Sequence, residues 1–441
     1  MDAQAHELRE IVGRHSYATE DICQRILRIV GDAPLVLIGE ATHGTREFYA
    51  IRAEITKRLI SEKGFAAVAV EADWPDAYRV NRYVQLQGKD SSAYQALRDF
   101  IRFPVWMWRN EVLLEFVDWL RSYNVLKGDR ERVGFYGMDL YSLCGSVYAV
   151  LDYLRHVDPK AAKLAKERYE CFAMYLSDPQ AYGYAAYLGI AKDCEREAIQ
   201  QLIDLRNKAA QYVQDHGLVQ YDAQFDAERN AVVIKRAEAY YKAMFGDPHN
   251  TWNLRDSHMF ETIQAIMSHL SDRRNRGKLV VWAHNSHIGD ARATEVGSRE
   301  LNIGQLAREH YGTQARLIGF TTYSGTVTAA SNWGESSRTK TVRPALPGSC
   351  EELFHRTSNE QFVISFESES LAREILSRSM LQRAIGVIYR PETEKISHYF
   401  RAKLAEQFDA VIHIDHTTAI RPVADEPFVT DEIPETYPTG L

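Results

Sequence analysis

The segment from Leu35 to Thr45, LVLIGEATHGT, constrains the fold of this chain more than any other stretch. A short apolar run ends at Gly39, Glu40 and His43 follow it three residues apart, and a helical pattern begins just beyond Thr45. A buried strand that ends in polar residues directly before a helix is typical of an open α/β sheet, in which ligands bind at the carboxyl ends of the strands. The segment therefore predicts both a fold class and the place of a site.

Other short runs rich in Val, Ile, Ala or aromatic residues have the length of buried strands. Helical patterns separate most of them, and this alternation indicates an α/β fold with a mostly parallel sheet flanked by helices on both faces. The predicted strands span residues 35–39, 65–71, 133–139, 278–284, 316–322, 384–389 and 410–414.

The stretch from 142 to 277 breaks this alternation because it is long, charged and poor in strand patterns. Its segments AAKLAKERYECFAMYL and CEREAIQQLIDLRNKAAQYVQ have the pattern of amphipathic helices. We expect a helical insertion over 142–277, between a first part of the α/β core over 1–141 and a second part over 278–441. The residues from Ala424 onward hold three prolines and many acids, which predicts an extended C-terminal tail.

The overall charge argues against a nucleic-acid partner, because the net charge is −7 and no basic stripe with interleaved aromatic residues occurs. The first residues lack the apolar core of a secretion signal, and no run approaches the roughly 20 apolar residues of a membrane-spanning helix. The five cysteines are scattered without a C-x-x-C pair, so we expect free thiols and a reducing, cytoplasmic location. Nothing in the sequence predicts an oligomeric state.

Ionisable side chains gather at the ends of four predicted strands. Parallel strands would bring them to one edge of the sheet, and a histidine becomes an effective base only when a neighbour fixes its tautomer and its pKa. A single histidine at a strand end is more often structural. Ionisable residues at the same end of four parallel strands, however, favour a catalytic or binding site. The residues concerned are Glu40, His43, Glu71, Asp139, His284 and His287.

Two other kinds of chemistry receive less support. Glu, His and Asp at these spacings would suit a divalent metal, but no H-E-x-x-H motif and no cysteine pair is present. Ser286 lacks the flanking glycines of a G-x-S-x-G nucleophile elbow, and neither G-x-G-x-x-G nor a phosphate-binding loop occurs. We therefore expect no cofactor, and we keep a divalent metal as the less favoured alternative.

Further residues are candidates for substrate contact. Arg52 lies near the start of the first core helix, where it would bind a carboxylate, an ester carbonyl or an oxyanion, or would pair with Glu71 or Asp73. Aromatic residues of FPVWMWRN would line an apolar cleft if they are not simply buried. Three histidines of the last third, His398, His413 and His416, are interpreted as structural. The predicted substrate-binding residues are Trp106, Trp108, Arg109, Asp139 and Arg255.

The motifs in combination resemble the erythromycin esterase family, nearly end to end. The segments that carry the resemblance are LIGEATHGTREFYAIRAEI, VAVEADWPDAYRVNRYV, FPVWMWRNEV, GFYGMDLYSL, NLRDSHMFETI, VVWAHNSHIGDARAT and GVIYRPETEKISHYFRAKLAEQFDAVIHID. The resemblance implies an α/β core whose helical insertion forms a cleft. In the antibiotic-resistance members a histidine after the first strand activates water to open the macrolactone ester, and His43 matches that position. Glu40, Arg52, Glu71, His284 and His287 also fall on positions of the family's site.

We therefore expect a cytoplasmic hydrolase of an ester or lactone, with a macrolide and antibiotic resistance as the family precedent. His43 would be the general base, Glu71 or Glu40 would orient its imidazole, and His284, His287 and Arg52 would stabilise the oxyanion or protonate the leaving alkoxide. The partner would be a small molecule, with neither nucleic acid nor membrane involved. The alternatives are a metal-dependent hydrolase that uses the same Glu and His residues, or a non-catalytic protein that binds a small ligand on the same superfamily fold.

Overall fold

The computed structural model describes residues 2–12, 17–214, 217–246, 248–274, 277–366 and 370–423. Its centre is an eight-stranded sheet in the order β3-β2-β4-β1-β5-β10-β7, with β6 paired to β5. The first six strands in this order are parallel to one another, whereas β7 and β6 are antiparallel to their neighbours. The strands are β3 (Gly134–Asp139), β2 (Ala67–Asp73), β4 (Leu279–Trp282), β1 (Leu35–Ile38), β5 (Ala315–Ala329), β10 (Ala410–Thr417), β7 (Gln361–Ser365) and β6 (Arg338–Val342).

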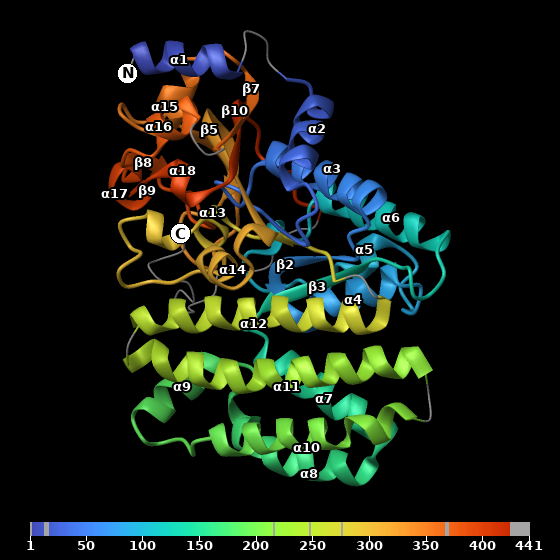
Figure 1. Cartoon of the computed structure of the whole chain (residues 1–441). Helices are drawn as coiled ribbons and strands as arrows, with labels where there is room; N and C mark the ends of the chain where they lie inside the picture. Colours follow the sequence, from blue (N-terminus) through green and yellow to red (C-terminus); the bar gives the residue numbers. More distant parts are fainter. Residues whose placement is uncertain are drawn as a thin grey trace.

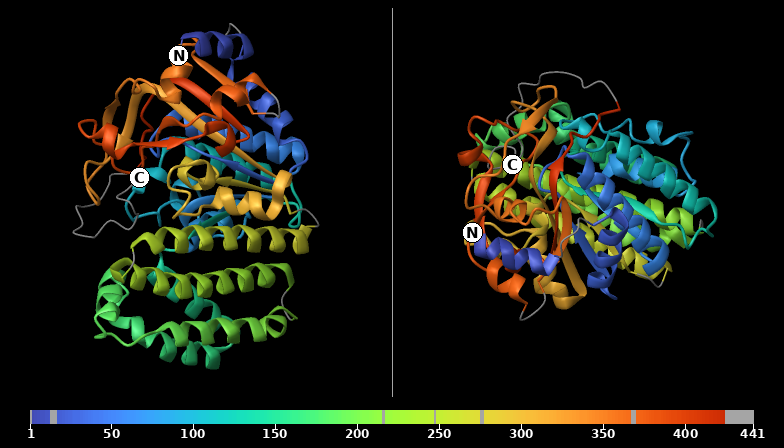
Figure 2. Two further views of the ribbon diagram at one scale, coloured as in Figure 1. Left: turned by 60° about the vertical axis from the view of Figure 1, so that its left-hand side comes forward. Right: turned by 90° about the horizontal axis from the view of Figure 1, so that it is seen from above.

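Helices cover both faces of the sheet (Figures 1 and 2). Alternate side chains of β1 divide between the two faces: Val36 and Ile38 pack with one set of helices, and Leu35 and Leu37 pack with the other. Because every residue of β1 is buried, its sequence is a continuous apolar run rather than an alternating one. The first face holds α2 (Thr19–Val30), α3 (Arg46–Lys63) and α6 (Glu111–Val125), and the second holds α1 (Asp2–Val12), α12 (Pro248–Arg274), α14 (Ile303–Tyr311), α15 (Cys350–His355) and α16 (Leu371–Leu376).

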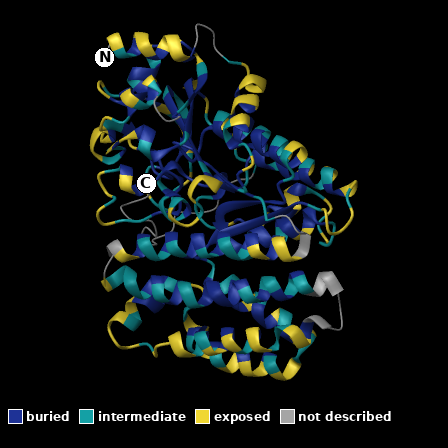
Figure 3. Cartoon of the chain, viewed as in Figure 1, coloured by how far each residue is buried: buried dark blue, intermediate teal, exposed yellow. Residues whose placement is uncertain are grey.

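The helices between β3 and β4 form a layered bundle against one side of the core (Figure 1). They have an apolar core of their own, while α12 contributes Met259 and Ile263 to the core of the sheet. The outer helices are the more exposed ones, whereas β1, β2, β3 and β4 are wholly buried (Figure 3). This bundle consists of α7 (Leu143–Val157), α8 (Pro159–Tyr169), α9 (Pro179–Tyr187), α10 (Glu195–Gln214), α11 (Gly217–Gly246) and α12.

Shorter elements complete the chain. A two-stranded ribbon pairs β8 (Met380–Arg383) with β9 (Tyr399–Ala402). Among the described residues, no helix combines the length and the apolar character that crossing a bilayer requires. The remaining helices are α4 (Trp74–Val84), α5 (Ala93–Ala96), α13 (Asn285–Ile288), α17 (Glu394–Ser397) and α18 (Leu404–Gln407).

The structure confirms an α/β fold with a mostly parallel sheet and helices on both faces, but it corrects one predicted strand. Residues 384–389 are buried without forming a ladder, and they make only isolated bridges, Ile385 with Thr42 and Ile388 with Ala330. The segment is apolar because it packs under the turn after β1, not because it joins the sheet. The antiparallel strands β6 to β9 were not predicted, and the predicted tail from residue 424 lies outside the described residues.

The expectation of free thiols throughout is also wrong. Cys171 and Cys194 are joined by a disulfide in the helical bundle, with their Cα atoms 6.0 Å apart, while Cys23, Cys144 and Cys350 are free. The two bonded cysteines are 23 positions apart in the sequence and meet only because the bundle folds back on itself. The premise for a reducing compartment therefore fails, and the cytoplasmic location remains a prediction.

Candidate active site

The strand order places the predicted site residues next to one another. β1 lies beside β4, and β4 lies beside β2, so the residues that follow these three strands share one stretch of the carboxyl edge. The rings of His43 and His284 are 4.8 Å apart between their centroids. Gly44 allows the turn after β1 to pack closely, since a Cβ there would lie 1.8 Å from the carbonyl oxygen of Thr328. Glu40, His43, Glu71 and His284 thus lie together at this edge of the sheet. Of the four, only His43 and Glu71 line the adjoining pocket, and the roles of all four in catalysis remain predictions.

His43 is held by a carboxylate that is itself held by an arginine. Its Nδ1 lies 2.9 Å from Oε1 of Glu40, and Oε2 of Glu40 lies 3.1 Å from Nη2 of Arg52. Both side chains of the ion pair are almost fully buried, and the guanidinium lies over the rings of Tyr49 and Trp282. The arrangement places the proton of neutral His43 on Nδ1 and leaves the lone pair on Nε2.

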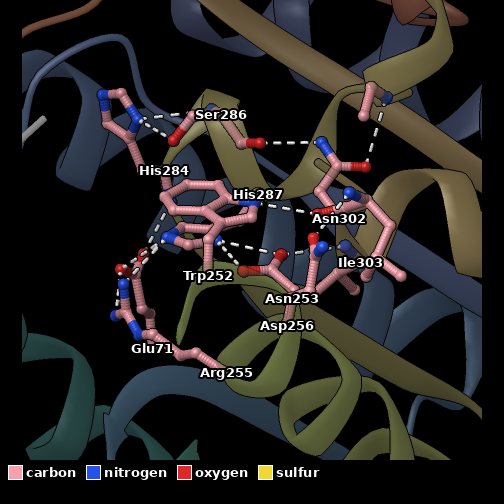
Figure 4. A network of polar contacts seen from close by, with 12 residues as sticks. Glu71, Trp252, Asn253, Arg255, Asp256, His284, Ser286, His287, Asn302 and Ile303 are labelled. Atoms are coloured by element: carbon pink, nitrogen blue, oxygen red, sulfur yellow. Dashed lines mark hydrogen bonds and ion pairs between the residues drawn. The ribbon is translucent and has the colours of Figure 1, made fainter. Parts of the chain in front are cut away.

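A second carboxylate, Glu71, organises the neighbouring part of the site (Figure 4). Its Oε1 accepts a hydrogen bond from Nη2 of Arg255 at 2.8 Å, and its Oε2 accepts one from the backbone N–H of His284 at 2.8 Å. Nε2 of His287 lies 3.3 Å from the same Oε1, and its Nδ1 lies 2.9 Å from Oδ2 of Asp256. Glu71 thereby links the ends of β2 and β4 to helix α12.

Burial and neighbouring charges shift the pKa values of the residues in this network. Burial alone would raise the pKa of Glu71, but the adjacent His287 and Arg255 hold that pKa well below its usual value. Burial alone would lower the pKa of His287, yet Asp256 and Glu71 on either side raise it to about 9. The raised pKa favours the imidazolium form of His287 at neutral pH, so we do not assign this ring as the general base.

His284 has the opposite character. Burial, together with the nearby His43, lowers the pKa of His284 to about 3, so its ring is neutral. Its Nδ1 accepts the backbone N–H of Ser286 at 3.3 Å and lies 2.8 Å from Oγ of the same serine. This contact places the proton on Nε2, a buried atom next to His43. The backbone of Ala41 also contacts the ring and acts to raise its pKa, against the effect of burial.

A pocket with a cavity volume of about 70 Å³, open to solvent, adjoins these residues. His43, Glu71, Asp139 and Arg255 contribute its polar wall. Its apolar wall includes Phe100, Phe103, Met107, Trp108, Tyr141 and Trp333. Because Arg255 comes from α12, the helical bundle supplies one side of the pocket and the strand ends supply the other.

The structure separates the predicted substrate-binding residues into two groups. Trp108 lines the pocket, and so do Asp139 and Arg255, which form a two-pronged ion pair with Nη2–Oδ2 at 2.7 Å and Nε–Oδ1 at 3.1 Å. Trp106 is buried in the core behind the wall, and Arg109 is half-buried outside the lining. Arg52 pairs with Glu40 rather than with Glu71 or Asp73, and it does not line the pocket.

The sequence reasoning missed the acidic end of the pocket. Asp73 ends β2 there, and Asp76 lies on the first turn of α4. Nη1 of Arg102 binds Oδ2 of Asp73 at 2.8 Å. Burial, reinforced by the charge of Asp73, raises the pKa of Asp76 to about 8. The three-residue spacing of the two acids after β2 was the available signal, whereas the partner Arg102 comes from a distant loop that no local pattern indicates.

The donor atoms of the site do not form a ready metal cage. Among the described residues, the group of acids and histidines whose donor atoms already lie within 4.8 Å of one another is Asp193, Glu195 and Glu238, in the helical bundle. Lys242 contacts all three of these acids. In the pocket, Glu40 and Glu71 each have an arginine partner, which supplies the positive charge that an ion would otherwise bring.

The comparisons with known proteins point to one protein family. The erythromycin esterase family model matches residues 60–417. The chain is similar to erythromycin esterase type II of Escherichia coli, with 24% identity over 312 residues that cover 68% of this chain and 71% of the relative. It is also similar to YbfO of Bacillus subtilis strain 168, with 22% identity over 87% of this chain and 84% of the relative.

Solved structures show the same fold at low identity. A Bacillus cereus protein aligns with a TM-score of 0.79 and 22% identity, covering 96% of this chain and all of the other. A succinoglycan biosynthesis protein aligns with a TM-score of 0.76 and 21% identity, covering 95% and 98%. A histidine-to-asparagine mutant of the erythromycin esterase EreC, in its open conformation, aligns with a TM-score of 0.63 and 16% identity, covering 89% and 93%.

The opposite pKa shifts of His287 and His284 predict that the two rings titrate at very different pH values. NMR of protein labelled at histidine measures both titrations. His287 should stay protonated through neutral pH and titrate near 9, and His284 should stay neutral down to about 3. Relative to an unfolded value of about 6.5, the raised pKa of His287 adds stability below pH 6.5 that is lost as pH rises through 9. The lowered pKa of His284 adds stability above pH 6.5 that is lost as pH falls toward 3. A midpoint near 6.5 for either ring would contradict the described network.

Proposed function

This chain belongs to the erythromycin esterase family of hydrolases, and we propose that it cleaves an ester or lactone by direct attack of water, with His43 as the general base. The observation that carries the proposal is the bond between Nδ1 of His43 and Oε1 of Glu40 at 2.9 Å, in a ring that lines the pocket. A carboxylate in this position orients the imidazole and stabilises the charge that the imidazole acquires.

The proposed step begins when Nε2 of His43 takes a proton from water as the water oxygen bonds to the carbonyl carbon. The tetrahedral intermediate then collapses, the bond from carbon to the ester oxygen breaks, and the leaving alkoxide receives the proton from His43. Glu40 stabilises the imidazolium in between, and the contact with Arg52 holds the carboxylate of Glu40 in position. Water, rather than a protein side chain, is the nucleophile, so no acyl-enzyme forms.

The oxyanion needs a neutral hydrogen-bond donor beside the base. We assign this role to the N–H on Nε2 of His284, because the ring is neutral and lies beside His43, and the donor would turn from the backbone of Ala41 to the oxyanion. His287 and Arg255 are engaged with carboxylates on two sides, and we assign them to positioning Glu71 and the backbone of His284. Arg52 takes a positioning role as well.

The nature of the pocket supports a small-molecule substrate with apolar and polar faces. Aromatic side chains line one wall, and the ionic groups of Asp139 and Arg255 line the other. A lactone or macrolide substrate, and with it a part in antibiotic resistance, is proposed on family membership. A cytoplasmic location, independence of metal, and the absence of nucleic-acid or membrane partners belong to the same proposal.

Replacing His43 by alanine is the direct test. Loss of a general base should reduce turnover of an activated ester by about 10²- to 10⁴-fold, while the melting temperature changes little because Glu40 keeps its ion pair with Arg52. The matched control is His156→Ala, which removes an exposed histidine of α7 whose Nδ1 lies 2.7 Å from the backbone oxygen of Asp152 in the same helix. A His43→Ala protein that keeps most of its turnover would contradict the proposal.

Chelation separates this proposal from a metal-dependent hydrolase. If the described side chains perform the whole reaction, then dialysis against a strong chelator should leave the rate of ester hydrolysis within about twofold of the untreated enzyme, since a lost catalytic ion would cost several kcal/mol of transition-state stabilisation. The measurement is the rate before dialysis, after it, and after adding back Zn²⁺ or Mn²⁺. A loss of activity that the ion restores would favour the metal-dependent alternative.

A further inference from the structure

Asp76 lines the catalytic pocket from the first turn of α4, and the proposed reaction gives it no task. We propose that Asp76 determines substrate specificity, and that its carboxylate binds a positively charged organic ammonium group of the ester or lactone. The inference rests on the proposed function, because it concerns the substrate of the same pocket, and it adds a chemical class to that substrate.

The acids of the pocket wall outnumber its arginines, and Asp76 is the acid without a partner. Each of the other three carboxylates binds an arginine, with nitrogen–oxygen distances between 2.7 and 2.8 Å; the pairs are Glu71 with Arg255, Asp139 with Arg255, and Asp73 with Arg102. Asp76, in contrast, makes no hydrogen bond or ion pair with the described residues. The wall of the pocket therefore lacks one positive charge, at the position of Asp76.

The surroundings of Asp76 make an unpaired carboxylate unfavourable. The side chain is half-buried, and burial raises its pKa to about 8. The negative charges of Asp73 and Asp99 act in the same direction, and the positive charge of Arg102 offsets them only in part. A cation in direct contact with Asp76 would compensate for both the desolvation and the repulsion. The pocket thus favours a ligand that brings the missing positive charge.

The aromatic side chains of the same pocket suit an ammonium group with carbon substituents. The rings that line the pocket are Phe100, Phe103, Trp108, Tyr141 and Trp333. The face of an aromatic ring attracts a cation, and proteins bind organic ammonium groups among several such rings. The pocket already contains contacts of this kind, because the guanidinium carbons of Arg102 and Arg255 lie 4.9 and 5.1 Å from the ring centroid of Tyr141. An organic ammonium group therefore matches the pocket in charge and in apolar character.

Two probes that differ in charge test this assignment without any turnover. Benzylammonium and benzyl alcohol are each titrated into the full chain at pH 7, and the dissociation constants are measured by calorimetry. The wild type should bind benzylammonium at least about tenfold more tightly, because a hydrogen bond between opposite charges is stronger than one between neutral groups. Asp76→Asn should remove this preference and leave the binding of benzyl alcohol unchanged. The matched control is Asp272→Asn, which removes an exposed carboxylate of α12 and should keep the preference.

Melting temperatures distinguish a binding role of Asp76 from a structural one. A carboxyl whose pKa is raised on folding costs stability as pH rises from its unfolded value of about 4 toward 8. Asp76→Asn should therefore melt at pH 7 no lower than the wild type does, and a lower melting temperature would assign Asp76 to the fold and overturn the proposal.

Equal binding of the two probes by the wild type, failure of benzylammonium to bind, or an unchanged preference in Asp76→Asn would overturn it as well. The two proposals can fail separately, because probe binding does not depend on catalysis. A chain that hydrolyses esters without preferring benzylammonium would contradict the specificity of Asp76 alone. A chain that prefers benzylammonium and hydrolyses no ester would contradict the proposed function.

Discussion

The buried ion pair between Arg52 and Glu40 is the interaction on which the geometry of the catalytic residues depends. It joins α3 to the turn after β1, and the guanidinium packs on Trp282 of β4, so one side chain connects a helix, a turn and a strand. Such a pair gains little net stability, because desolvation of the charges offsets their attraction. Removal of one partner, in contrast, costs about 3–5 kcal/mol and leaves a buried charge. The pair therefore defines the position of His43 rather than contributing much to the stability of the fold.

Two carboxylates give two neighbouring histidines opposite tasks. Glu40 accepts from His43 and leaves Nε2 of that ring as a proton acceptor, while Glu71 holds the backbone of His284, whose ring keeps a proton on Nε2 as a donor. Burial keeps His284 neutral, and the carboxylates around His287 keep that ring charged. An acceptor and a donor side by side match the needs of water attack on a carbonyl group.

The sequence predicts the parts of this site that are local in the chain. Glu40 and His43 are three residues apart and pair directly, and parallel strands bring Glu71 and His284 to the same edge. Partners contributed by distant segments were not predictable, because no periodicity encodes them: Asp256 behind His287 and Arg102 beside Asp73 are examples. Burial alone separates Trp108, which lines the pocket, from Trp106 two residues earlier. The apolar run 384–389 and the bonded cysteines were misjudged for the same reason, since their neighbours are remote in sequence.

The most direct test of the account is a double-mutant cycle on one ester, comparing Glu40→Gln, His43→Ala and the protein that carries both changes. If Glu40 acts through His43, the Glu40→Gln change should slow kcat/KM in the wild type by at least about tenfold, yet it should have little further effect once His43 is alanine, because residues that act as a unit are not additive. Equal effects of Glu40→Gln in both backgrounds, with each protein still folded, would show that the carboxylate and the imidazole act independently and would contradict the central claim.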